Sequence, residues 1–167
     1  MFIKKIFYKI TNLEKYNDYK INLAIQKKIK WYNSGIQDQI IDIQKKIENQ
    51  NELSFLHSGH SGDIVDSLAV IKEISKTHKC NYYIQVEKPL DPNARHYKRF
   101  GDHVFLADTK VDMLMPLLAN QPYIQKVDKY TNQEIDIDFN LIREMPTNFN
   151  LDYVGCYSTI TGVHTDL

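Results

Sequence analysis

A short apolar strand that turns abruptly into a helix constrains the fold of this chain most. Residues 53–57 (LSFLH) have the length and apolar character of a buried strand, and small turn residues follow directly. From Gly62 or Asp63 to about Thr77, apolar residues recur at helical spacing. Residues 80–87, rich in aromatic and β-branched side chains, then predict a second strand. A strand, a helix and a strand in succession form a βαβ unit, so the two strands should be parallel.

The remainder of the chain continues this alternation of strands and helices. Patterns typical of further elements follow a polar loop over 88–102: strands over 103–108, 124–130 and 135–142, and helices over 111–120 and 150–163. Pro116 is expected to kink the first of these helices or to restart it. The predicted fold class is therefore α/β, with a Rossmann-like open, mostly parallel sheet and flanking helices over residues 51–167.

Residues 1–50 predict an amphipathic helical segment in front of this domain. A stripe of isoleucines runs from Ile21 to Ile47 in steps of four, four and three, close to the helical period. Gly35 interrupts the stripe and is a candidate helix end. The stripe either packs on its own domain or forms a docking surface, for example in a homo-oligomer. The start, MFIKKIFYKI, is expected to be a helix packed on the edge of the domain, with a membrane surface as the alternative.

Composition and charge exclude several classes of protein. Lysine plus arginine equals aspartate plus glutamate at 21 each, so no overall attraction to nucleic acid or to an anionic membrane is predicted, although local patches stay open. No apolar run of about 18 residues exists, so no transmembrane segment is expected. The two cysteines, Cys80 and Cys156, lie far apart and fit free thiols in a reducing compartment. A cytoplasmic location is predicted, with peripheral association with the inner membrane as the alternative.

The turn HSGHSGD is the candidate site, because ligands collect at the carboxyl ends of parallel strands. It lacks both the GxGxxG and the Walker A spacing, which disfavours a classical nucleotide loop. His57 and His60 have only Asp63 as a nearby third ligand, so no metal is predicted. Asp63 itself is either a catalytic carboxylate or only a helix cap, and Gly59 and Gly62 would let the backbone approach a partner closely.

The same stretch resembles a known family of enzymes. FLHSGHSGDIVDSLAVIKEI is similar to the first strand, turn and helix of the ADP-heptose:lipopolysaccharide heptosyltransferases and related GT-B glycosyltransferases. Gly62-Asp63-Ile64 match the family's Gly-Asp signature, and Leu68-Ala69 stands where Leu-Pro is usual. Later, MPLLANQPYIQKVDKY and IDIDFN resemble the family's next helix, turn and strands, with Gln121-Pro122 in place of Asn-Pro. The resemblance covers about Leu53–Asn140.

This resemblance implies the acceptor-side half of an enzyme that moves a sugar from a nucleotide-sugar to an acceptor hydroxyl. Asp63 would be the general base, and no metal or other cofactor is expected. The substrate-binding residues that it implies lie in the turn and in the following basic loop: His57, Ser58, Gly59, His60, Ser61, Gly62, Arg95, His96, Lys98 and Arg99. The two histidines and the basic loop also have a purely structural interpretation.

The family has a second half that binds the nucleotide-sugar, and the chain ends at Leu167, where that half would begin. A second chain that carries a donor-binding domain is therefore an expected partner, beside a sugar or glycan acceptor, and little turnover is expected of this chain alone. Two other functions stay open. One is a non-catalytic α/β binding or assembly module that uses the isoleucine stripe, and the other is an enzyme of another class, such as a nucleotide-sugar epimerase.

Overall fold

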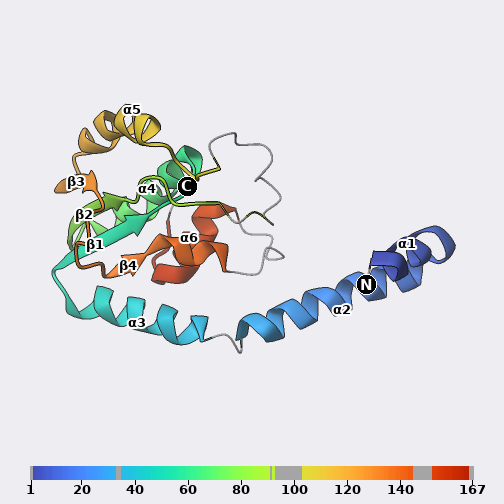
Figure 1. Ribbon diagram of the computed structural model, residues 1–167. Helices are drawn as coiled ribbons and strands as arrows, with labels where there is room; N and C mark the ends of the chain where they lie inside the picture. The colour runs from blue at the N-terminus through green and yellow to red at the C-terminus, as the bar shows by residue number, and fades with distance from the viewer. Residues whose placement is uncertain (1, 33–34, 91, 93–102, 145–151, 166–167) are drawn as a thin grey trace.

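The computed structural model describes residues 2–32, 35–90, 92, 103–144 and 152–165 (Figure 1). Its helices are α1 (Phe2–Thr11), α2 (Leu13–Tyr32), α3 (Ile36–Asn49), α4 (Ser61–Ile74), α5 (Asp108–Ala119) and α6 (Tyr153–Thr161), with a 3-10 helix η2 (Phe139–Arg143). Its strands are β1 (Glu52–His57), β2 (Lys79–Ile84), β3 (Lys126–Lys129) and β4 (Ile137–Asp138).

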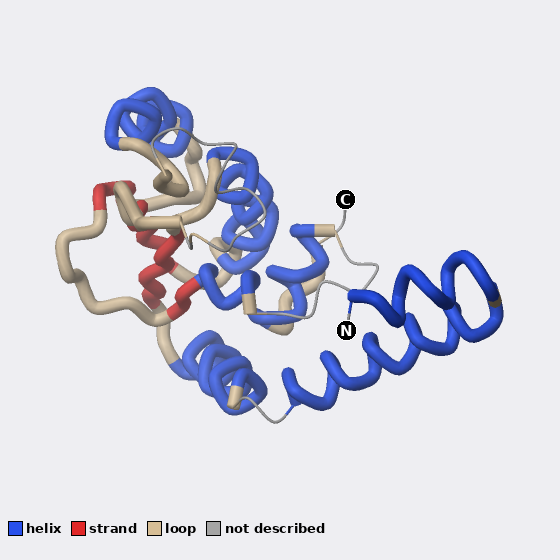
Figure 2. The backbone as a smooth tube through the Cα atoms, turned by 45° about the vertical axis from the view of Figure 1, so that its right-hand side comes forward, coloured by secondary structure: helices blue, strands red, loops and turns tan. Residues whose placement is uncertain are grey.

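The strands form a parallel sheet in the order β3-β2-β1-β4 within the described residues. β1 pairs with β2 from Glu52↔Lys79 to His57↔Ile84. On its other side β1 pairs with β4 through Phe55↔Ile137 and Leu56↔Asp138. Helices flank this sheet, as Figure 2 shows, so the predicted α/β, Rossmann-like fold class is confirmed.

Aliphatic and aromatic residues at the predicted positions build the core. Phe55 of β1 stacks on Phe139 with 5.4 Å between ring centroids, and Tyr82 of β2 is fully buried. The Tyr82 hydroxyl is hydrogen-bonded to Ser67 Oγ of α4 at 2.7 Å, so its polar end is satisfied inside the core. Helix α6 packs against both α4 and α3, which brings the end of the described chain next to the helix that follows β1.

Two predicted strands differ from the structure. Residues 103–108 contribute only an isolated antiparallel bridge between Val104 and Pro89. The expected strand over 135–142 ends after Asp138, because the Asp138 side chain accepts a hydrogen bond from Asn140 N at 2.8 Å and caps η2. Helix α5 continues through Pro116, so the helix does not restart there.

The N-terminal helices divide into two parts. Helices α1 and α2 form a hairpin that projects away from the sheet (Figures 1 and 2), whereas α3 lies against the domain. The expectation that α1 packs on the domain edge is not met: α1 packs on α2, where the rings of Tyr8 and Tyr19 lie 6.1 Å apart edge to face. In α3, Ile40 and its neighbours along the stripe are buried in the core, whereas Ile25 of α2 is exposed.

This division predicts different stability effects for two isoleucines of one stripe. We expect Ile40→Ala to lower the free energy of unfolding by about 2–5 kcal/mol, because it leaves a cavity in the core. Ile25→Ala should change it by less than about 0.5 kcal/mol, since that side chain is 48% exposed. Chemical denaturation followed by circular dichroism measures both, and equal effects would contradict the division.

Candidate functional site

The candidate site lies where the strand order reverses. From β1 the chain proceeds to β2 and β3 on one side of the sheet, and it then returns to β4 on the other side. The connections that follow β1 and β4 lie next to each other at the carboxyl edge, which is the place where open α/β sheets bind ligands. The loop Ser58–His60 leads from β1 into α4, and η2 follows β4 directly. These two connections supply most of the polar groups of the site.

His57, the last residue of β1, is fully buried and hydrogen-bonded through both ring nitrogens. Gly59 N donates to Nδ1 at 2.7 Å, so the ring proton belongs to Nε2, which donates to Tyr157 Oη at 2.7 Å. The Tyr157 hydroxyl then donates to the backbone carbonyl of Asp63 at 3.0 Å. This chain of hydrogen bonds ties β1, the turn, α4 and α6 together, so the geometry favours the structural interpretation of this histidine.

The imidazole of His57 is held in its neutral form. Burial lowers its pKa from 6.5 to about 3, and the positive charges of Arg143 and Lys88 act in the same direction. A neutral ring is what the network requires, because a protonated Nδ1 could not accept the hydrogen bond from Gly59.

Asn140 joins the connections that follow β1 and β4. Its side-chain oxygen accepts hydrogen bonds from Ser58 N at 3.0 Å and from Ser58 Oγ at 2.5 Å. It also accepts from Arg143 Nη1 at 2.5 Å, while its own Nδ2 donates to Asp138 Oδ1 at 2.6 Å. The amide is thus fixed in one orientation, and it fixes the positions of the loop after β1 and the guanidinium of Arg143.

Asp63 lies in the first turn of α4, partly exposed, beside Arg143. Its Oδ2 accepts a hydrogen bond from His60 N at 3.2 Å, so the side chain does cap the helix. The same oxygen lies 3.8 Å from Arg143 Nη2. In the described part of the chain no hydrogen-bond donor contacts Oδ1, so this oxygen can still accept a hydrogen bond or a proton. Capping is therefore one role of Asp63 and leaves room for another.

Arg143 is the central cation of the site. Its guanidinium lies over the ring of Phe105, 4.2 Å from the centroid, in cation–π geometry. Burial lowers the pKa of this guanidinium, and the charge of the Asp63 carboxylate opposes the shift. Nη2 is buried and has no hydrogen-bond partner among the described residues, so the group keeps unused donor capacity.

The two glycines of the turn have different surroundings. A methyl group on Gly59 would press into the His57 ring and would lie 2.7 Å from both Arg143 Nη2 and Asp63 Oδ2. A methyl group on Gly62 would meet nothing within 4 Å. Gly59 therefore makes room for the site's own ion pair, while the backbone at Gly62 faces open space at the start of α4.

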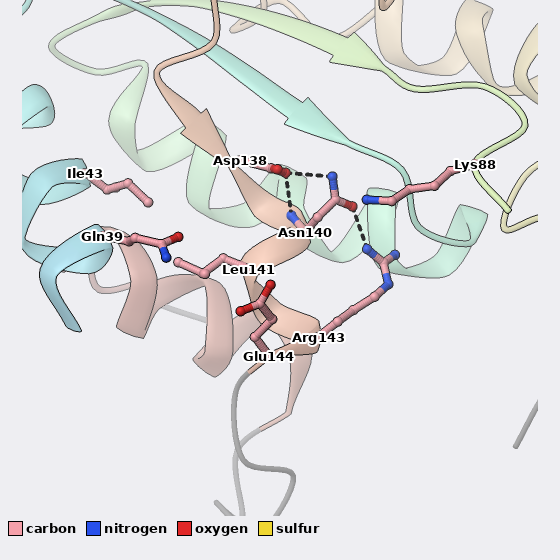
Figure 3. Close-up of a pocket in the computed structure, with 8 residues that line it drawn as sticks. All are labelled: Gln39, Ile43, Lys88, Asp138, Asn140, Leu141, Arg143 and Glu144. Carbon is pink, nitrogen blue, oxygen red and sulfur yellow. Dashed lines mark hydrogen bonds between the residues drawn. The ribbon is translucent and has the colours of Figure 1, made fainter. Parts of the chain in front are cut away.

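A polar cavity of about 280 Å³ adjoins this cluster (Figure 3). Arg143, Asn140 and Glu144 line it from η2 and the residue after it, and Lys88 and Asp138 line it from the loop after β2 and from the end of β4. Gln39 and Ile43 of α3 close its remaining side, as Figure 3 shows. Acidic, basic and amide groups face one small space, which is a lining suited to a hydroxyl-rich or partly charged ligand.

The structure brings the predicted turn residues together around Asp63, yet none of residues 57–63 lines the cavity, which Arg143 connects to them. Ser58 is buried against Asn140, and His60 Nδ1 donates to the carbonyl of Phe105 at 2.7 Å. Ser61 is exposed at the start of α4. The predicted basic residues Arg95, His96, Lys98 and Arg99 lie outside the described residues, so their role stays a prediction.

Several polar residues of the site were not predicted from the sequence: Lys88, Asp138, Asn140, Arg143, Glu144 and Tyr157. A signal existed for Asn140 and Arg143, because they follow a predicted parallel strand whose carboxyl end must share an edge with the turn after β1. Tyr157 had no such signal, since only the packing of α6 on α4 places it beside His57. Among the described residues, no group of three or more His, Cys, Asp or Glu side chains could hold a metal ion.

The contrast between the glycines predicts opposite effects of the same substitution. We expect Gly59→Ala to destabilise the protein by about 1–3 kcal/mol, because the new methyl group overpacks a buried site. Gly62→Ala should leave the stability unchanged or raise it by up to about 1 kcal/mol, since alanine is the better helix former. Urea denaturation of both variants checks this, and a destabilised Gly62→Ala protein would contradict it.

The buried neutral histidine predicts a specific pH dependence of stability. Between pH 6.5 and about 3 the unfolded chain binds a proton at this histidine and the folded chain does not, so stability falls as pH falls. His57→Gln removes this contribution, so the wild-type free energy of unfolding should fall more steeply with acid, by up to about 1.4 kcal/mol per pH unit. Denaturation curves of both proteins between about pH 4 and pH 7 measure the difference, and parallel pH profiles would refute the prediction.

Comparison of the chain with protein-family models, curated proteins and solved structures found no match. The resemblance to the heptosyltransferases therefore stays a prediction, and the chemistry of the site is inferred from the geometry of the switch point.

Proposed function

We propose that the chain is the acceptor-side domain of a glycosyltransferase, in which Asp63 takes the proton of an acceptor hydroxyl. The observation that carries this proposal is that only one of the two carboxylate oxygens of Asp63 is held by other groups of the described structure. One of its oxygens is held by His60 N–H and lies near Arg143, while the other has no donor among the described residues. A base that is fixed in position yet still open on one oxygen is the arrangement that proton abstraction needs.

The polar cavity beside Arg143 supports a sugar as the acceptor. Sugars bind through planar polar side chains that accept and donate to neighbouring hydroxyls, and Asp138, Asn140 and Glu144 provide such groups around the cavity. Lys88 and Arg143 add two cations, so a sugar that carries a phosphate or carboxylate fits better than a neutral one. Arg143 lines the cavity and its Nη2 lies 3.8 Å from Asp63 Oδ2, which supports a base next to a bound acceptor.

In the proposed reaction, the acceptor oxygen attacks the anomeric carbon of a nucleotide-sugar. The bond between that carbon and the diphosphate breaks, and the diphosphate leaves with the electron pair. The acceptor proton passes to Asp63 as the new bond forms. A donor-binding domain would have to supply the nucleotide-sugar, because the proposal assigns the cavity beside Arg143 to the acceptor. The partners proposed are therefore a sugar or glycan acceptor and a donor-binding domain on a second chain.

The location proposed is the cytoplasm. Cys80 is buried and unpaired, and Cys156 is also a free thiol. Burial raises the pKa of the Cys80 thiol to about 12, so this cysteine stays protonated and unreactive. Free thiols fit a reducing compartment. No described helix is both long and apolar enough to cross a bilayer.

A non-catalytic assembly module is the second candidate, because Ile21, Ile25 and Ile29 of α2 are exposed on one stripe. In that case the substitution of Asp63 would cost a helix cap, about 1 kcal/mol of stability, and would affect no ligand.

Ligand binding separates these alternatives. We expect the chain to bind phosphorylated or carboxylated sugars and to bind nucleoside diphosphates and nucleotide-sugars poorly, as measured by isothermal titration calorimetry. Arg143→Gln should weaken sugar binding about tenfold or more, because it removes a cation from the cavity. Lys110→Gln on α5, an exposed lysine distant in sequence from the turn, is the matched control. Tight nucleotide binding would contradict the acceptor-side assignment.

The role of Asp63 is tested by Asp63→Asn, which keeps the shape of the cap and removes the base. In an assay with donor-binding domain and acceptor both present, sugar transfer should fall by about a hundredfold or more while acceptor binding is unchanged. Asp66→Asn removes a carboxylate one helical turn further along α4 and should retain activity. Equal activity of Asp63→Asn and wild type would refute the proposed base.

A further inference from the structure

The hairpin of α1 and α2 concentrates positive charge that the whole chain does not show. Residues 1–32 contain eight lysines and two acidic residues, a formal charge of +6. Residues 33–167 contain 13 basic and 19 acidic residues, a formal charge of −6. The net charge of zero is therefore the sum of a basic hairpin and an acidic body. A polyanionic surface would attract the hairpin and repel the body.

The same hairpin exposes apolar stripes. Ile6, Phe7 and Ile10 recur on one stripe of α1, and Ile21, Ile25 and Ile29 recur in steps of four along α2. These six side chains are between 44% and 78% exposed. The hairpin is held together elsewhere, through the edge-to-face contact of Tyr8 and Tyr19, so the stripes are left without a partner in the described structure.

We propose that this hairpin binds the surface of an anionic lipid bilayer, with its apolar stripes in the interface and its lysines on the headgroups. α1 is strongly amphipathic, with exposed Phe and Ile, three lysines and no acidic residue, and this is the pattern of helices that lie in the interface plane. The projection of the hairpin away from the sheet leaves it accessible (Figures 1 and 2). The acidic body would be held on the water side, which gives the bound protein a defined orientation.

Charge and apolar surface together favour lipid over the other partners. A second hairpin of the same charge would be repelled, so pairing of hairpins between two copies is disfavoured. A nucleic acid would attract the lysines and would leave the isoleucine stripes in water. A surface with anionic groups above an apolar phase satisfies both features. Lipid binding by the hairpin does not depend on sugar transfer.

Flotation of the full chain with lipid vesicles tests the proposal. We expect the protein to float with vesicles of phosphatidylglycerol and phosphatidylcholine in equal parts, and to bind pure phosphatidylcholine vesicles much less. The double variant Phe7→Ser, Ile10→Ser should lower the partition coefficient about tenfold or more, because two apolar side chains no longer enter the interface. Neutralising Lys9, Lys15 and Lys30 to Gln should weaken binding mainly at low salt.

The matched control is the double variant Met113→Ser, Leu117→Ser, which removes two exposed apolar side chains from α5 on the body. It should float like the wild type, and circular dichroism should show unchanged helix content in every variant. Wild-type protein that stays unbound to anionic vesicles would overturn the proposal, as would equal loss in the α5 control. Dimers in sedimentation that depend on Phe7 and Ile10, or RNA binding without flotation, would replace it with a protein or nucleic-acid partner.

Discussion

The hydrogen bonds that Asn140 Oδ1 accepts from Ser58 hold the site together. The backbone pairing of β1 with β4 ends at Leu56↔Asp138, so side chains have to join the connections that follow the two strands. A single side-chain oxygen does so here, and it also binds Arg143. The positions of Arg143 and of the carboxylate beside it thus depend on one amide, whose orientation Asp138 fixes in turn.

The network of His57 gives this arrangement its second support. A neutral imidazole, a tyrosine hydroxyl and a backbone carbonyl form a chain from β1 to α6 with each polar group satisfied. The carboxylate of Asp63 therefore projects from a helix whose first turn is fixed by contacts with both Tyr157 and His60. A rigid first turn is the physical condition under which a carboxylate can serve as a positioned base, and it is what connects the fold with the proposed chemistry.

The βαβ unit could be predicted from the sequence because strand, turn and helix each had a local signal between Leu53 and Ile84. The length of β4 was overestimated because a local hydrogen bond from Asn140 N to the side chain of Asp138 starts η2 and ends the strand where the apolar pattern continues. The sequence predicted the part of the site that the turn after β1 forms, because small residues and Asp63 are adjacent there. Its other half comes from η2 and α6, and no pattern in the sequence relates Arg143 or Tyr157 to a turn about 80 residues or more earlier.

The brevity of the outer strands has a consequence for association of the protein. In the described sheet β4 has two residues and β3 has four, so each outer edge presents few unpaired backbone groups. β3 also carries Lys126, Asp128 and Lys129, whose charges would have to lose water before another strand could pair there. The sheet is thus protected against edge-to-edge pairing, and contacts with other molecules are directed to its helices and its carboxyl edge.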